Sequence, residues 1–521
     1  MEDIIIRGGT VIDGTGAPGY RADVAVKGGV ISAIGDLSQA AAARVLDAGG
    51  LAVAPGFIDS HAHSDLSFLQ DDSGASKLYQ GVTTEISGQC GSSPFPARAE
   101  DGDEAWRCAS FDGFVKRFER EGRRMAVNQA MLVGHGSLRA AVIGDEDRPA
   151  TPDEMAQMKS LLRRDLEAGA WGMSLGLEYP PGFFAASAEL NELGAVARAF
   201  DGLVPCHMRS EGLHIDEAIE ELLNVGRASG VHVHVSHLKL DHVSAHGRAP
   251  EVWARLERAQ RDGVRVSADM YPFTASCTGL TIRCPKWSQE GGGAAVAARL
   301  NGPRRAEVVA GIRAHYPSAE RAETCLFSDE DGLWPQIVGK TLRQVAEDIL
   351  HTSDYAEAAA QVLTRTQGRA NCIFFVMSEA DMLYFLARDV GIGSDGRALS
   401  GDPARVAGRP HPRSYAALTE FFRLARERGL CPLEEAVRRV TSKPADMIGL
   451  GDRGRLRVGL TADITVFDPR AIAPRATYLD PIRLSVGVQH VLLSGGIALE
   501  NGAQTARRAG RFLRKPVGAP R

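Results

Sequence analysis

The chain has 521 residues, of which 44% are hydrophobic, 24% charged and 6% aromatic, a composition that excludes a disordered chain and a small disulfide-stapled scaffold. Lys and Arg total 60 against 65 for Asp and Glu, so the formal charge of −5 gives no basis for a nucleic-acid-binding or anionic-membrane-binding surface. We therefore expect a small-molecule partner.

The start of the chain and its cysteines indicate a cytoplasmic protein. Met1-Glu2-Asp3 is acidic where a signal peptide would be basic, and no apolar run approaches the roughly 18 residues of a membrane-spanning helix. The 8 Cys are dispersed with no CxxC pair, which excludes a disulfide framework and a structural zinc finger. The oligomeric state is left open.

Both ends of the chain are rich in short β-type runs. Near the start, apolar runs at 4–11, 23–26 and 30–34 include a hairpin signature, because Gly28-Gly29 separates the last two. The same pattern returns near the other end, at 462–469, 488–493 and 497–499. The sequence predicts that residues 1–54 and 449–521 together form a small β-sandwich domain.

Between residues 55 and 448, short apolar strands are each followed by a longer stretch, several with helical periodicity. The strand candidates are 57–63, 82–90, 130–135, 170–175, 202–207, 231–237, 264–270 and 390–395. The helix candidates are 153–168, 188–199, 215–229, 250–262 and 433–441. Eight strands alternating with helices predict an α/β fold, a (β/α)8 TIM-type barrel.

The stretch between Tyr271 and Val390 is too long for one loop and predicts an inserted helical segment after strand seven, at about 283–370. Helices are expected there at about 294–314 and 341–363. Residues 371–377 form a ninth strand candidate, which leaves the strand count open by one.

Metal-binding residue types stand at the ends of the strand candidates. His61 and His63 share a face of the first strand with Asp59, because alternate residues of a strand point the same way. Further candidates end the second, fifth, sixth and eighth strands, namely Cys90, His207, His237 and Asp395. The carboxyl ends of barrel strands converge on one mouth, so these side chains predict a metal centre there.

Three other histidines have a different interpretation. By the same alternation, His232 and His234 lie on the face opposite His237, so we expect them to be structural and packed toward the surrounding helices. His135 ends the third strand, where it is either structural or a support behind the metal ligands.

Motifs spread over nearly the whole chain resemble the amidohydrolase superfamily and, within it, the D-aminoacylase family of N-acyl-D-amino-acid deacylases. They are Pro55-Gly56-Phe57-Ile58-Asp59-Ser60-His61-Ala62-His63, Gly88-Gln89-Cys90-Gly91, Gly176-Leu177-Glu178-Tyr179-Pro180-Pro181-Gly182, His207-Met208-Arg209-Ser210-Glu211, Ser236-His237-Leu238-Lys239, Asp269-Met270-Tyr271-Pro272-Phe273, Gly393-Ser394-Asp395-Gly396 and Arg409-Pro410-His411-Pro412-Arg413. Many superfamily members place a bridging carboxylated Lys on the fourth strand, but here residues 170–176 contain no Lys. The family uses a strand-two Cys instead, which Cys90 matches.

The resemblance implies zinc-dependent hydrolysis of a linear, non-peptide amide. Cys90, His207 and His237 would hold one tightly bound zinc, and His61, His63 and Asp395 a weaker second position. Thiolate and imidazole are favourable zinc ligands, and three protein ligands leave a position open for water. Zinc would activate that water, and Asp395 would carry its proton to the leaving nitrogen.

A deacylase for amino acids must also hold the α-carboxylate of its substrate. Three positions match the family's carboxylate-binding residues: Lys239 two residues after His237, Tyr271 at the end of the seventh strand, and Arg413 in the loop after the eighth. Arg283, at the start of the insertion, stands where relatives acting on hydrophobic substrates carry an apolar residue. We hypothesise that Arg283 meets a second negative charge, as in N-acyl-D-glutamate or N-acyl-D-aspartate.

The chain departs from the family pattern after Tyr415, where Ala416-Ala417-Leu418 replaces the usual Gly-Thr-Phe, and in a longer spacing from Asp395 to Arg413. Both features bear on the pocket wall and the substrate. Two alternatives therefore stay open: another C–N hydrolase of the superfamily, either a dihydroorotase-like cyclic amidase or an N-substituted formamide deformylase, and a non-catalytic barrel protein. Loss of a ligand would have favoured the last, and all are present.

Overall fold

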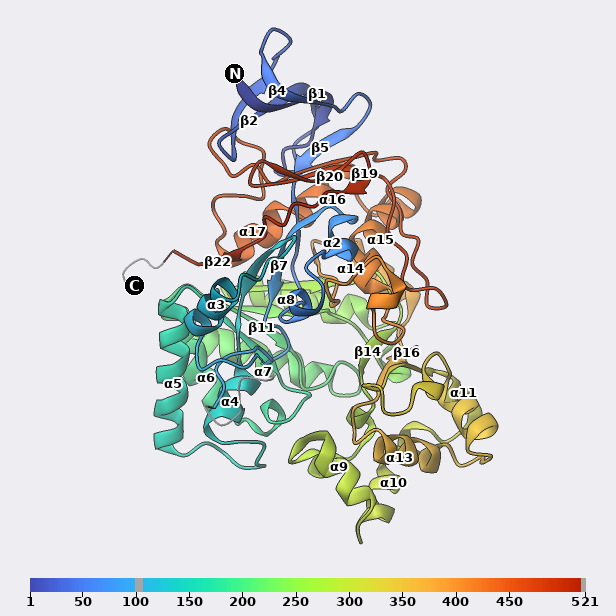
Figure 1. The fold of residues 1–521 in the computed structure, drawn as a ribbon. Coiled ribbons are helices and arrows are strands. Elements are labelled where there is room, and N and C mark those ends of the chain that lie inside the picture. The colour runs from blue at the N-terminus through green and yellow to red at the C-terminus, as the bar shows by residue number, and fades with distance from the viewer. Residues whose placement is uncertain (99–105, 517–521) are drawn as a thin grey trace.

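Four hydrogen-bonded sheets organise the part of the chain that this computed structural model describes, residues 1–98 and 106–516. A nine-stranded sheet lies at one end of the molecule, a three-stranded sheet with its own helices lies toward the other end, and two ladders of parallel strands lie between them (Figure 1). The fold is therefore mixed α/β, as the sequence predicts. None of the helices in these ranges is both long and apolar enough to cross a bilayer.

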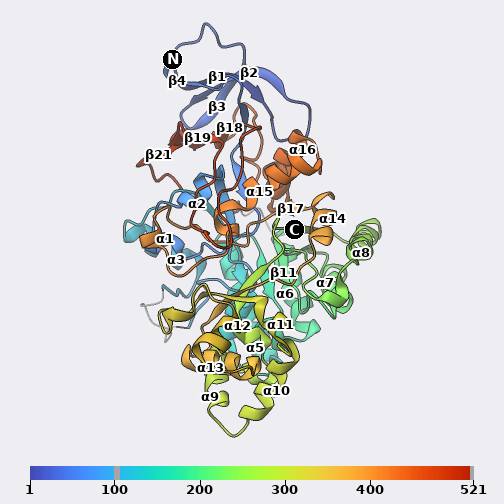
Figure 2. The same cartoon turned by 90° about the vertical axis from the view of Figure 1, so that its right-hand side faces the viewer.

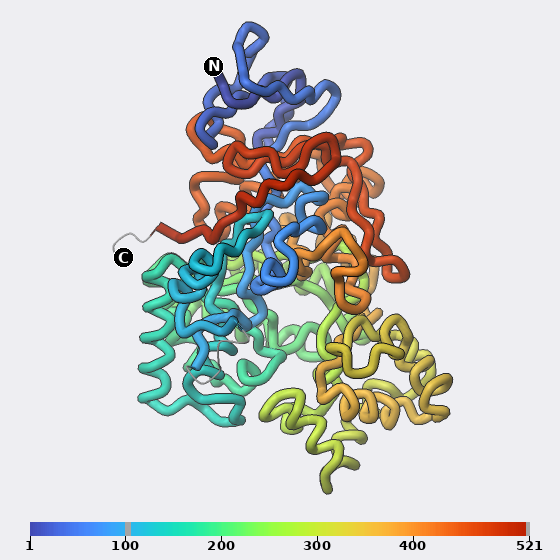
Figure 3. The backbone as a smooth tube through the Cα atoms, in the orientation of Figure 1, coloured from blue at the N-terminus to red at the C-terminus, as the bar shows by residue number. Residues whose placement is uncertain are grey.

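The nine-stranded sheet takes strands from both ends of the chain, which lie side by side as blue and red segments in Figures 1 and 3. Its strands are β1 (Glu2–Val11), β2 (Tyr20–Lys27), β3 (Val30–Gly35), β4 (Ala42–Asp47), β5 (Ala52–Pro55), β18 (Ile464–Phe467), β19 (Val488–Leu493), β20 (Gly496–Glu500) and β21 (Ala503–Gln504). The two ends join where β5 pairs antiparallel with β18. The predicted β2–β3 hairpin is present, with Gly28 and Gly29 at the positive φ values of 59° and 83° that its turn requires.

Each of the eight strand candidates of the central region contains a strand, and all of these strands pair in parallel. One ladder contains β6 (Phe57–Asp59), β7 (Val82–Ser87) and β8 (Asn128–Met131). The other contains β9 (Val133–Gly134), β10 (Met173–Gly176), β11 (Leu203–His207), β12 (His232–Val235), β13 (Val266–Met270) and β17 (Gly391–Ile392).

In one ladder, β22 (Phe512–Leu513) pairs with β8 on the side away from β7. In the other ladder, the short β9, which begins two residues after the end of β8, pairs with β10. The predicted closed eight-stranded sheet is thus observed as two ladders.

Helices cover the parallel strands, and the predicted ones occur within two residues of their expected bounds. They are α5 (Pro152–Glu167), α6 (Ser187–Ala199), α7 (Ile215–Ser229), α8 (Ala249–Arg261) and α16 (Leu433–Arg439). The remaining helices of this region are α1 (Ser67–Gln70), α2 (Ala75–Leu78), α3 (Phe111–Arg120), α4 (His135–Val142), α14 (Glu379–Leu386), α15 (Arg413–Arg428) and α17 (Ser442–Ile448). In α7, for example, Ile215, Ile219 and Leu222 form a buried stripe at helical spacing, and Gly230 ends the helix in the left-handed conformation.

The segment between β13 and β17 carries a sheet and a hydrophobic cluster of its own. Its antiparallel strands are β14 (Ser276–Gly279), β15 (Cys325–Asp329) and β16 (Asn371–Phe374), and its main helices are α9 (Gly292–Leu300), α10 (Arg305–His315), α11 (Ala319–Glu323) and α13 (Tyr355–Arg365). Residues 371–377, the ninth strand candidate, therefore contribute β16 to this sheet and not a further parallel strand. Figure 2 shows these helices at the end of the molecule away from the nine-stranded sheet.

Candidate metal centre and active site

A cavity of about 900 Å³ opens at the carboxyl ends of the parallel strands. Its lining includes residues that end or follow five of these strands, namely Cys90, His207, His237, Tyr271 and Asp395. The segment after β13 contributes a second wall, with residues such as Cys277, Ile282 and Asn371. Of the predicted site residues, all except His61 and Arg283 line this cavity.

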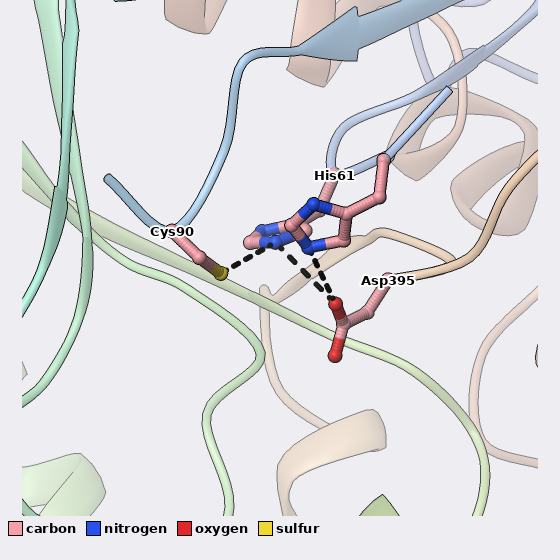
Figure 4. Close-up of side chains that lie close together, drawn as sticks. His61, Cys90 and Asp395 are labelled. Carbon is pink, nitrogen blue, oxygen red and sulfur yellow. Dashed lines mark hydrogen bonds and ion pairs between the residues drawn. The ribbon is translucent and has the colours of Figure 1, made fainter. Parts of the chain in front are cut away.

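His61 and His63 lie in the loop after β6, because the strand ends at Asp59 and does not extend to residue 63 as predicted. The Asp59 carboxylate accepts the backbone N–H of His61 at 3.2 Å and that of Ser394 at 2.8 Å, which fixes the loop. Nε2 of His61 lies 3.4 Å from Sγ of Cys90 (Figure 4). Nε2 of His63 lies 3.0 Å from Oδ1 of Asp395.

The Cys90 thiol stands between two groups of metal-binding atoms. Its Sγ lies 3.4 Å from Nε2 of His237, which in turn lies 3.0 Å from Nδ1 of His207. Possible ligand atoms of Cys90, His207 and His237 lie within 4.8 Å of one another, and so do those of His61, His63, Cys90 and Asp395. The structure therefore brings together all six side chains that the sequence nominated for the metal centre.

Three of these residues have the left-handed backbone conformation that non-glycine residues rarely adopt. The φ values are 51° for Cys90, 38° for His237 and 49° for Asp395, each two or three residues beyond the end of a parallel strand. Such conformations cost on the order of 1–3 kcal/mol each and concentrate at functional sites. Here they place three side chains at one cavity.

The left-handed turn at His237 also explains why one orientation was predicted wrongly. β12 ends at Val235, so the alternation does not continue to His237. His234 points away from the covering helices, toward Asp269, with 3.1 Å between Nε2 and Oδ2, and both His232 and His234 contact the Ser267 hydroxyl at 2.8 Å. Neither belongs to the metal-binding groups, which agrees with a structural role.

Asp269 is a supporting carboxylate that the sequence reasoning missed. It accepts the backbone N–H of His237 at 2.6 Å and the Ser60 hydroxyl at 2.8 Å. Burial acts to raise the pKa of Asp269, but His234, His61 and the hydrogen bond from the His237 backbone outweigh it and hold the pKa well below its usual value. Asp269 thus fixes the turn that carries His237. His135, by contrast, begins α4 and contacts Glu189 at 2.7 Å, away from both metal-binding groups.

Two further carboxylates orient the histidines and were also missed. Oε2 of Glu178 lies 2.8 Å from Nε2 of His207, and Oε1 of Glu211 lies 2.9 Å from Nδ1 of His237. The other ring nitrogens, Nδ1 of His207 and Nε2 of His237, lie 3.0 Å apart beside Cys90. Carboxylates commonly support metal-binding imidazoles in this way, by contacting the ring nitrogen that does not bind the metal. Glu211 lies four residues after His207, within the segment 207–211, and this short spacing is the sequence signal that points to it.

Asp395 is held between the histidines and Arg413. Its Oδ2 forms a 2.7 Å ion pair with Nη1 of Arg413. Burial acts to raise the pKa of Asp395, but the charge of Arg413, followed by the histidines, lowers it well below the usual value, so the carboxylate is ionised. Arg413 is the first residue of α15 and not part of a loop as predicted, and its guanidinium lies 4.9 Å over the Tyr271 ring.

Lys239 and Tyr271 line the cavity beside Arg413. Lys239 lies beyond the end of β12, not on its face as predicted, and forms an ion pair with Glu211. Tyr271 directly follows β13. Arg283 lies 4.5 Å over the Phe374 ring, outside the cavity lining, and its charge acts on Glu178 and Asp241, which do line it.

The comparisons with known proteins agree with this geometry. The model of the amidohydrolase family matches residues 44–324 and 395–498. The N-acyl-D-glutamate deacylase of Alcaligenes xylosoxydans xylosoxydans is 36% identical over 99% of this chain and 98% of its own length. The D-aminoacylase of the same organism is 35% identical over 98% of this chain and 97% of its own length.

A solved structure is similar over the same extent. The crystal structure of N-acyl-D-glutamate deacylase from Bordetella bronchiseptica, complexed with zinc and a phosphonate inhibitor that mimics the tetrahedral intermediate, is 34% identical, with a TM-score of 0.84. The similarity covers 98% of this chain and 99% of that one.

Proposed function

The chain belongs to the amidohydrolase family, and we propose that it is a zinc-dependent deacylase that hydrolyses N-acyl-D-amino acids to a carboxylate and a free D-amino acid. The observation that carries this proposal is the shared position of the Cys90 thiol between the two groups of metal-binding atoms. The two deacylases that match nearly the whole chain support the substrate class and its stereochemistry.

The proposal includes one (β/α)8 barrel at residues 55–448, with an insertion at about 283–370, and a small β-sandwich domain from 1–54 and 449–521. Backbone hydrogen bonds between the segments after β6 and β17 support a closed barrel, because Asp395 donates to His61 and His63 donates to Gly396, both at 2.8 Å. The nine-stranded sheet from both ends of the chain supports the second domain.

The donor set fits zinc. Ligands at zinc distances of about 2.0–2.3 Å lie roughly 3.3–3.8 Å apart in a tetrahedron, close to the 3.4 Å contacts of Cys90 with His61 and His237. Burial, and after it the negative charge of Asp395, raises the pKa of the Cys90 thiol well above its usual value. A bound cation is therefore needed to stabilise the thiolate. Cys90, His207 and His237 would hold the tightly bound ion, and His61, His63 and Asp395 a weaker second one.

Zinc in this position supplies Lewis acidity, which lowers the pKa of water toward about 7 and polarises an amide carbonyl. Asp395, ionised by its pairing with Arg413, accepts a proton from the water as its oxygen attacks the amide carbon. Asp395 then delivers that proton to the nitrogen as the C–N bond breaks, which releases a carboxylic acid and an amine. The acid passes its remaining proton to the amine, so the products are a carboxylate and an ammonium group. Glu178 and Glu211 hold the rings of His207 and His237 in place.

Lys239, Tyr271 and Arg413 would bind the α-carboxylate of the substrate, because they place two cations and a phenol on one wall of the cavity. Arg283 would set a preference for an acidic side chain. Its guanidinium has no hydrogen bond or ion pair to any residue in the described ranges, although its charge influences Glu178 and Asp241 at the cavity. A cation that has neither a hydrogen bond nor an ion pair beside a substrate cavity favours an anionic group on the ligand.

The direct test combines zinc analysis with a hydrolysis screen of paired N-acetyl-D- and N-acetyl-L-amino acids. We expect bound zinc, turnover of the D forms only, and loss of both zinc and turnover in a Cys90→Ala variant. Cys206→Ala is the matched control, since Cys206 is buried nearby at the end of β11 but belongs to neither group of metal-binding atoms. Full zinc and activity in Cys90→Ala would overturn the proposal.

A further inference from the structure

A fully buried lysine stands behind the His61 loop. The Lys77 side chain, on α2, is 0% exposed, and its ammonium contacts two carboxylates that are equally buried, Asp59 at 2.7 Å and Glu85 at 3.0 Å. A third contact, also at 2.7 Å, is to the Ser394 hydroxyl. Burial acts to lower the pKa of Lys77, but the two carboxylates raise it above the usual value, so the amine carries a charge.

Each partner of Lys77 is attached to one of the two loops that supply the second metal-binding group. Asp59 accepts the backbone N–H groups of His61 and Ser394, so one carboxylate joins the loops. Ser394 directly precedes Asp395, and its hydroxyl accepts the N–H of Gly396 at 3.0 Å.

The third partner, Glu85, joins the loops through another serine. It accepts the Ser64 hydroxyl at 2.9 Å, and that hydroxyl in turn accepts the N–H of Ala398 at 2.7 Å. Lys77 is thus the one cation among the described side chains that contacts this set of buried acceptors.

We propose that Lys77 is a positioning residue that holds the loops of His61 and Asp395 in register, and so determines whether the second metal position forms. Without the ammonium, two buried carboxylates would repel each other, and Asp59 would no longer hold both loops at once. Cys90, His207 and His237 do not contact this network, so the tightly bound ion would remain. The inference rests on the proposed function, because it concerns the metal centre of that reaction.

A buried ion pair elsewhere in the chain supplies the matched control. Arg453 is 3% exposed and pairs with Asp463 at 2.9 Å, beside the nine-stranded sheet and outside the cavity lining. In Lys77→Met, and equally in Arg453→Met, buried carboxylates lose their cationic partner. Loss of stability is therefore common to both variants, whereas an effect on the metal centre is expected for Lys77 alone.

The experiment compares Lys77→Met, Lys77→Met/Glu85→Gln and Arg453→Met with the unaltered chain. The double variant removes one of the two unpaired carboxylate charges, so that a folded protein is obtained if Lys77→Met alone does not fold. Zinc per chain is titrated, the thermal unfolding of metal-free protein is followed, and kcat and KM are measured on an N-acetyl-D-amino acid.

We expect the Lys77 variants to keep the first zinc equivalent and to bind the second about 10- to 100-fold more weakly. We also expect them to lose kcat with little change in KM, because the loop that carries Asp395, the proton carrier, is no longer held in place. Arg453→Met should lose stability alone. Two titrated zinc positions of unaltered affinity in a folded Lys77 variant, or an equal loss in Arg453→Met, would overturn the inference. Absence of zinc or turnover in the unaltered chain would instead refute the proposed function, so the two failures are distinguishable.

Discussion

The turn between β2 and β3 and the turns after β7, β12 and β17 use the same left-handed backbone with different residues. In the β2–β3 turn the conformation is taken by Gly28 and Gly29, which adopt it at little cost, although Ser494 and Asn501 adopt it in two other turns of the same sheet. At the cavity it is taken by Cys90, His237 and Asp395, for which it is strained. The β2–β3 turn thus costs the sheet little stability, whereas the three cavity turns accept a loss of stability in order to place side chains that can bind metal or carry a proton. Substitutions in the two regions should therefore affect different measurements.

The largest effect on turnover is expected for Asp395→Asn. The amide keeps the size of the side chain but cannot accept the proton of water, so kcat should fall about 10²- to 10⁴-fold. Steady-state kinetics on an N-acetyl-D-amino acid measure this, and thermal unfolding should show that the fold persists. A kcat within a few-fold of the unaltered value would show that another group carries the proton.

The next effect is expected for Glu211→Gln, at the carboxylate that contacts Nδ1 of His237. Loss of this charge weakens the orientation of the imidazole, and such changes cost about 10- to 100-fold in metal affinity or activity. Zinc titration with a competing chelator measures the change. Glu217→Gln is the control, because Glu217 is exposed on α7, and unaltered zinc affinity in both variants would remove Glu211 from the metal centre.

A smaller and selective effect is expected for Arg283→Ala. If Arg283 meets an acidic side chain, the ratio of kcat/KM for N-acetyl-D-glutamate to that for N-acetyl-D-leucine should fall by about tenfold or more, since one charge-assisted hydrogen bond contributes roughly 1.5–3 kcal/mol. Arg304→Ala, which removes a guanidinium over Trp287 in the same inserted segment, should leave the ratio unchanged. If the ratio does not change in Arg283→Ala, a preference for substrates with an acidic side chain must come from another residue.

The sequence predicts the terminal sheet better than the turns around the cavity, because hydrophobic periodicity reports strands and helices and not the turns that follow them. Apolar runs and Gly pairs report hydrogen-bonded elements, so the hairpin at Gly28-Gly29 was predicted, and five helices of the central region were predicted within two residues of their bounds. Periodicity ends where a strand ends. The orientation of His234 was therefore wrong, because the left-handed turn at His237 interrupts the alternation on which the prediction relied.

The supporting charges were missed for a different reason. Lys77 meets Ser394, and Asp269 meets Ser60 and His237, only in the folded chain, and neither spacing nor composition distinguishes these charges from surface charges. The six metal-binding candidates could be predicted because each ends a strand candidate, and the parallel order of the strands brings such ends together. The pairing of β22 with β8 could not be predicted, because the two residues of β22 carry no strand signal of their own.

The smallest effect on turnover is expected for a substitution in the terminal sheet, Ile6→Ala. Ile6 is fully buried in β1, opposite Val24 of β2 and Leu46 of β4. Truncation leaves a cavity and should lower the free energy of unfolding by about 2–5 kcal/mol. Because no described residue of this sheet's hydrophobic cluster lines the substrate cavity, kcat and the zinc content of the folded protein should not change.

Urea denaturation followed by circular dichroism measures the free energy of unfolding, and steady-state kinetics at urea concentrations below the transition measure kcat. A loss of kcat in parallel with stability would show that the sheet and the cavity are coupled, and that the division between a stabilising region and a reactive one does not hold.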